Sequence, residues 1–190
     1  SRVPGGSTVE DWPFGVEELE RYYDTVEREL GVSGKAGNIN GNIDSRGNIY
    51  EAPRRREYPM PPLRWTDWHE KMAAAARGLG FHPFPGPAAV NTQTYEGRPG
   101  CAYHGFCARG GCHVNAKGST AVTTIPKAQK TGKLDVVTEA HVTEVNVDNN
   151  GRVTGVTYVK GTEEFFQPAG VVLLATYTYE NVRTLLLSKS

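Results

Sequence analysis

The sequence predicts an α+β fold in two parts: a helical and loop-rich segment over residues 1–132 and a strand-rich segment over residues 133–190. Three observations support this prediction. A helical pattern of apolar residues lies near the start, and 22 glycines and 12 prolines interrupt a chain of 190 residues. Short apolar stretches separated by turn residues fill the last third.

The first expected helix runs from Val16 to Leu30 and stops at Gly31, a residue type that commonly follows helices. Its apolar residues recur every three or four positions, so they share one face. The opposite face is charged, and we expect it to be solvated surface. The apolar face consists of Val16, Leu19, Tyr23, Val26 and Leu30, and the charged face of Glu17, Glu20, Arg21, Asp24 and Arg28.

Residues 33–62 are expected to be irregular. The tripeptide Gly-Asn-Ile occurs three times, at 37–39, 41–43 and 47–49, and both Gly and Asn favour tight turns. The spacing is too short for a solenoid repeat. The basic run Arg54-Arg55-Arg56 is expected to be exposed or paired with acidic residues.

A second helix is expected from Asp67 to about Leu79, with Thr66 as its N-cap. Its alanine run favours helix. We expect His69 to be partly buried beside an inward stripe made of Trp68, Met72, Ala75 and Leu79.

The last third predicts a three-stranded antiparallel meander. The turn Asp148-Asn149-Asn150-Gly151 separates a stretch with Val142, Val145 and Val147 from a strand over 153–159, and Asn-Gly between such stretches is a strong hairpin signal. A second turn at 160–162 leads into a strand over 163–167.

Two further strands and a helix flank the meander. We expect a short strand over 134–137 and a strand over 171–175, whose continuous apolar run is typical of a parallel sheet covered on both faces. A helix over 178–188 follows, with Val182, Leu185 and Leu186 facing inward.

Composition excludes some classes of function. The formal net charge is +0, which argues against a surface that binds nucleic acid. No strictly apolar run exceeds five residues, the length of the run from Val171 to Ala175, far below the roughly 20 that a spanning helix needs. No secretion signal is visible at the N-terminus.

All three cysteines, Cys101, Cys107 and Cys112, lie within twelve positions, together with His104 and His113. Thiolates and imidazoles close in sequence are typical metal ligands. Three cysteines can hold a three-iron cluster with one thiolate per iron, and with His104 they can hold zinc. The spacing is equally compatible with cysteines that bind no metal, so these three interpretations stay open.

Several stretches together resemble the GMC (glucose–methanol–choline) oxidoreductases, especially the branch with the large subunits of gluconate 2-dehydrogenase and related sugar dehydrogenases. The matching stretches cover nearly the whole chain, in the family's order. They are Asp11-Trp12-Pro13-Phe14-Gly15, Tyr58-Pro59-Met60-Pro61-Pro62-Leu63, Leu79-Gly80-Phe81-His82-Pro83, Gly97-Arg98-Pro99 with the cysteine loop, Asn115-Ala116-Lys117, and Glu180-Asn181-Val182-Arg183.

The resemblance implies part of an FAD-binding, Rossmann-like domain. It further implies an enzyme that oxidises an alcohol group of a sugar or polyol by hydride transfer to the flavin. Electrons then leave through an iron–sulfur cluster or a cytochrome partner. It favours a 3Fe–4S cluster on Cys101, Cys107 and Cys112, although related sequences often have a further cysteine where this chain has His104. A small subunit, a cytochrome c acceptor and a periplasmic location also follow from the resemblance alone.

The resemblance implies three cofactor-binding residues, of which two match the family's FAD contacts and the third, Thr176, departs from the family's usual residue. Val142 corresponds to the position whose backbone reads the adenine edge, and Ala175 to a small residue packed by the adenosine. Thr176 follows it where the family more often has Ala or Gly.

The family's G-x-G-x-x-G fingerprint and its catalytic histidine have no counterpart here. We therefore expect an internal segment that is inactive by itself and contributes no catalytic residue. The alternative is a stand-alone metal-binding or electron-transfer module without flavin.

Overall fold

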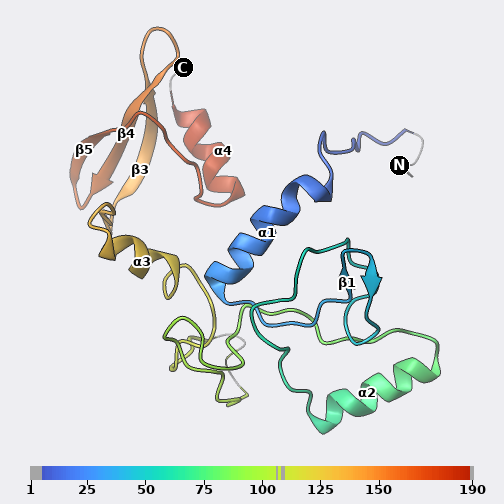
Figure 1. Ribbon diagram of the computed structural model, residues 1–190. Helices are drawn as coiled ribbons and strands as arrows, with labels where there is room; N and C mark the ends of the chain where they lie inside the picture. Colours follow the sequence, from blue (N-terminus) through green and yellow to red (C-terminus); the bar gives the residue numbers. More distant parts are fainter. Residues whose placement is uncertain (1–5, 106, 108–109, 189–190) are drawn as a thin grey trace. The chain divides into compact units, whose positions relative to one another are not determined.

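The structure is a computed structural model that describes residues 6–105, 107 and 110–188. The residues at 1–5, where no secretion signal was expected, and residues 106 and 108–109 of the cysteine loop lie outside this description. The chain divides into two compact units, Ser1–Lys133 and Leu134–Ser190. The first contains α1, β1, β2, α2 and α3, and the second contains β3, β4, β5 and α4 (Figure 1). Within the described residues, no helix is both long enough and apolar enough to cross a membrane.

Helix α1 (Val16–Leu30) has the predicted bounds. It ends because Gly31 adopts a left-handed backbone with φ of 74°, which is costly for other residues. A side chain at this position would also collide with its surroundings, since a Cβ would lie 2.7 Å from the Arg98 guanidinium.

The prediction of which face of α1 is buried was wrong. Asp24, expected in solvent, is only 9% exposed, whereas Tyr23 and Val26 on the apolar face are 55% and 53% exposed. The physical reason is the basic run at 54–56. Its guanidinium groups pair with the acidic face of α1, so the run is salt-bridged as expected.

The segment after α1 forms a short hairpin of β1 (Asn38–Ile39) and β2 (Asn42–Ile43). Asn40 and Gly41 turn the chain with φ of 51° and 88°. Gly37 approaches the backbone of Asn48 so closely that a Cβ would lie 2.3 Å from it. The Gly-Asn-Ile repeats therefore supply turns and close backbone contacts, as the composition indicated.

Helix α2 (Asp67–Gly78) begins at the predicted cap. Nδ1 of His69 accepts the backbone N–H of Thr66 at 3.3 Å and lies 2.8 Å from the Thr66 hydroxyl, so His69 is an exposed capping residue, not the partly buried one predicted. The predicted inward stripe is also exposed, with Trp68 at 66% and Leu79 at 76%, while Ala73 is buried.

A third helix, α3 (Thr124–Lys130), was not predicted.

The predicted meander is present in the second unit. Strands β3 (His141–Val147), β4 (Val153–Lys160) and β5 (Glu163–Pro168) form an antiparallel sheet in that order. The Asp148 side chain accepts the backbone N–H groups of Asn150 and Arg152 at 2.8 and 2.9 Å. Gly151 has φ of 75°, so the turn residues act as their types predict.

The two other expected strands do not form. Residues 134–137 and 171–175 belong to no strand, and Val136, Val171 and Leu173 are 53%, 79% and 89% exposed. Their apolar runs suit a sheet interior, but no neighbouring strand pairs with them among the described residues. Helix α4 (Thr178–Leu187) does form, with Thr184 buried and the predicted inward Leu186 81% exposed.

Candidate functional site

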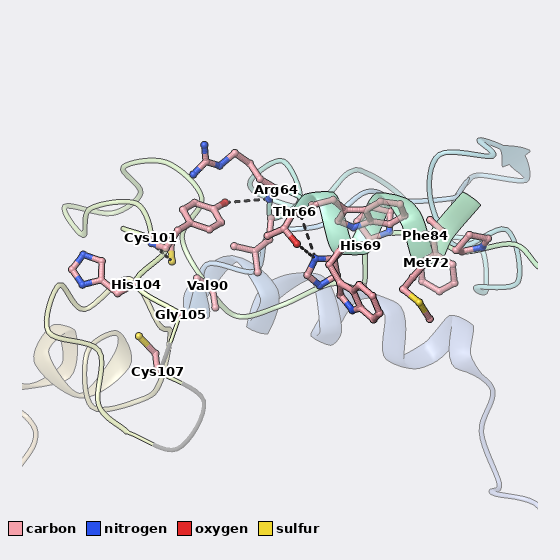
Figure 2. A pocket seen from close by; sticks show the side chains of 18 of the residues that line it. Arg64, Thr66, His69, Met72, Phe84, Val90, Cys101, His104, Gly105 and Cys107 are labelled. Carbon is pink, nitrogen blue, oxygen red and sulfur yellow. Dashed lines mark hydrogen bonds between the residues drawn. The ribbon is translucent and has the colours of Figure 1, made fainter. Parts of the chain in front are cut away.

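The three cysteines line one cavity of about 870 Å³ in the first unit. Cys101, His104 and Cys107 lie at one end, and His69, Met72 and Phe84 at the other (Figure 2). Trp65 and Trp68 also line the cavity and add aromatic wall to it. The cavity is therefore mainly apolar, with sulfur and imidazole at one end.

The described residues do not fit a metal cluster. All three cysteines are free and partly exposed, and no three described His, Cys, Asp or Glu side chains lie close enough together to hold a metal ion. Sγ of Cys101 accepts the backbone N–H of Tyr103 at 3.3 Å. The cluster on Cys101, Cys107 and Cys112 therefore stays a prediction of the resemblance.

Cys112 has a distinct electrostatic environment. Backbone N–H groups near its sulfur lower the pKa of the thiol, although desolvation opposes them. The largest contribution comes from Lys117, followed by those of Val114, Ala116 and Asn115. These amides favour the thiolate form of Cys112.

Asn91, which the sequence did not single out, holds both ends of the cysteine loop. It is fully buried. Its N–H donates to the carbonyl of Ala116 and its carbonyl accepts the N–H of Cys101, both at 2.8 Å. Its side chain donates to the carbonyl of Arg98 at 3.0 Å. The sequence around Asn91 gives no signal of this role, because its partners lie up to 25 positions away.

The predicted cofactor contacts lie in the second unit, around a cavity of about 640 Å³. Val142 and Thr176 both line this cavity. Ala175 is exposed and lies between two lining residues, Leu174 and Thr176, but does not line the cavity itself. The structure thus brings together two of the three predicted residues.

One side chain fixes the turn that carries Thr176. Oδ1 of Asn181 accepts the backbone N–H of Thr176 at 3.0 Å and its hydroxyl at 2.7 Å. Nδ2 of Asn181 donates to the carbonyl of Leu174 at 3.3 Å. The turn then enters α4 through Tyr177, which has φ of 81°.

Charged residues that the sequence did not single out lie along the same cavity. Arg183 reaches Nε2 of His141 at 3.4 Å and the carboxylate of Glu180 at 3.5 Å. Val142, Val156 and Val172 supply apolar wall. Apolar walls with a few polar groups are typical of sites that bind small molecules.

Comparison with known proteins shows which family the chain resembles in sequence. The family described as GMC oxidoreductase matches residues 69–189. The gluconate 2-dehydrogenase flavoprotein of Pantoea cypripedii is 33% identical over 98% of this chain. The paromamine 6'-oxidase of Streptomyces fradiae is 30% identical over 82%, and the fructose dehydrogenase large subunit of Gluconobacter japonicus is 28% identical over 78%. The matched regions are 32%, 26% and 25% of those proteins, so this chain spans a quarter to a third of their lengths.

Proposed function

The chain belongs to the GMC oxidoreductase family, and from this premise we propose that it is an internal segment of a longer FAD-dependent dehydrogenase. The observation that carries the proposal is the family match over residues 69–189. The matched residues include the three-stranded sheet, α4 and the cavity lined by Val142 and Thr176.

In this proposal, the second unit contributes to a Rossmann-like FAD domain. The apolar, unpaired segments 134–137 and 171–175 become strands of its parallel sheet, which accounts for their composition. Val142, Ala175 and Thr176 hold the adenosine half of FAD. When bound, the flavin supplies a hydride acceptor.

The proposed substrate is an alcohol group of a sugar or polyol. The compounds in the names of the three relatives, gluconate, paromamine and fructose, all carry hydroxyl groups. One relative is named as a large subunit, which supports a small subunit as a partner. A cytochrome c that accepts the electrons is proposed from the family resemblance alone. No step of this proposal passes through the cysteine loop, because its described residues do not form a metal site.

The test is to purify the native-length protein anaerobically and measure bound FAD, iron and acid-labile sulfide in one sample. Gluconate, fructose and glycerol are then added in turn, and the flavin absorbance is followed. We expect stoichiometric FAD that at least one of these compounds bleaches. Protein with iron and sulfide but no flavin would instead support the stand-alone electron-transfer module.

A pair of variants tests the site. Val142→Trp fills the cavity and is expected to weaken FAD binding more than tenfold, because the ring occupies space that the adenosine needs. Thr154→Trp is the matched control: Thr154 is an exposed β-branched residue of the same sheet that does not line the cavity. Equal FAD binding by both variants would refute the assignment of Val142.

A further inference from the structure

The orientation of the Asn181 amide follows from its two neighbours. Its nitrogen must face the carbonyl of Leu174, at 3.3 Å, and its oxygen must face the two donors of Thr176, at 3.0 and 2.7 Å. The reverse orientation would set the amide NH₂ against the Thr176 N–H and the amide oxygen against a carbonyl. Only one orientation satisfies the network.

This orientation determines what the Thr176 hydroxyl can do. A hydroxyl has one hydrogen and two lone pairs, and the Thr176 hydrogen is donated to Asn181. Thr176 lines the cavity, so its free lone pairs are available to a ligand there. A ligand group that meets this oxygen must therefore be a hydrogen-bond donor.

We propose that Thr176 is a specificity-determining residue, held by Asn181 as a hydrogen-bond acceptor for an N–H or O–H donor on the adenosine half of FAD. The inference rests on the proposed function. It adds that one position in the cavity wall accepts a hydrogen bond from the ligand and donates none. Adenosine offers two kinds of donor, the exocyclic amine of the base and the ribose hydroxyls. A carbonyl or phosphate oxygen would meet lone pairs and be disfavoured at this position.

Two hydroxyls line the cavity, those of Thr176 and Thr184. Thr184 is buried, whereas Thr176 is exposed. Arg183 contacts both His141 and Glu180. The other wall residues named above, Val142, Val156 and Val172, have no polar side-chain atoms. Thr176 is exposed, so water competes for its oxygen, and the hydrogen bond should add about two- to tenfold in affinity.

The experiment measures the dissociation constant of FAD from flavin-free, native-length protein by flavin fluorescence. The variants are Thr176→Val, which keeps the shape but loses the hydroxyl, and Thr176→Ser, which keeps the hydroxyl. Thr176→Ala is a second loss-of-hydroxyl variant, of the type common in the family, in case the valine protein does not fold. Each protein is titrated with FAD, with an analogue lacking the 6-amino group and with analogues lacking one ribose hydroxyl.

We expect the valine and alanine variants to bind FAD about two- to tenfold more weakly and the serine variant to bind it as the parent does. The loss should vanish for one analogue, and that analogue identifies the donor. A loss of the same size for FAD and every analogue would overturn the inference, because Thr176 would then act only on the turn. Unchanged FAD binding would also overturn it. A parent protein that binds no FAD would refute the proposed function itself, a result distinct from the other two.

Discussion

Helices α1 and α4 both leave apolar residues exposed, yet different forces hold them within their units. The acidic face of α1 pairs with three arginines at 54–56. Helix α4 is joined to β3 by a hydrogen bond from the N–H of Val145 to Ser188 Oγ, which in turn donates to the carbonyl of Thr184. An amphipathic pattern therefore indicates a helix, but it does not say which face contacts its own unit.

The largest expected effect in this comparison is that of Asp24→Asn. Asp24 accepts from Arg56 at 2.9 Å and from Arg28 at 3.2 Å, and a neutral amide cannot replace a carboxylate shared by two cations. We expect a loss of about 1–3 kcal/mol in the stability of the first unit. The rate of amide hydrogen exchange along α1 measures this loss of stability. Glu18→Gln, an exposed position on the same helix, is the control, and equal exchange in both variants would contradict the ion-pair account.

The pH dependence of stability tests the same ion pairs of Asp24. The Arg56 side chain, together with Arg28, lowers the pKa of Asp24 from 3.8 to about 2 in the folded protein. Because the folded pKa lies below the unfolded one, the pair stabilises the fold at higher pH. This stability is lost as the pH falls from about 4 to 2. Asp24→Asn should lack this component of the loss, so parallel acid-unfolding curves for the two proteins would contradict the prediction.

A smaller effect is expected from Ser188→Ala, which removes the link between α4 and β3. The N–H of Val145, a buried residue, then loses its 2.8 Å partner. We expect a loss of about 1 kcal/mol, measured by hydrogen exchange of the Val145 amide. Ser188→Thr keeps the hydroxyl and should restore protection. If the Val145 amide exchanges as slowly in the Ser188→Ala variant as in the parent protein, packing and not this hydrogen bond joins the helix to the sheet.

The smallest effect should come from Glu180→Gln. Glu180 and Arg183 are about half exposed and 3.5 Å apart, and such surface pairs contribute little. The thermal midpoint of the protein should stay within error of the parent value. A clear drop would mean that ion pairs hold α4 as they hold α1, and the contrast between the two helices would disappear.

The sequence predicted what neighbouring residues determine and failed where distant partners decide. Val16–Leu30 with Gly31, and the hairpin turn at Gly151, follow from local periodicity and backbone preference. The burial of Asp24 depends on Arg56, which lies 32 positions away. The roles of Asn91 and Asn181 could not be predicted, because each side chain binds backbone groups of a turn whose shape the sequence does not reveal. Val142 and Thr176 line one cavity, but the resemblance, not the spacing, pointed to them.

The anchoring of the cysteine loop by Asn91 has a consequence for evolution. Because residue 91 joins residues 101 and 116 through its own backbone, the loop is closed at its base independently of what it contains. The entropy of closing a flexible loop grows only with the logarithm of its length. Because backbone groups make both hydrogen bonds, the identity of side chains between these two points can change while the base of the loop is kept.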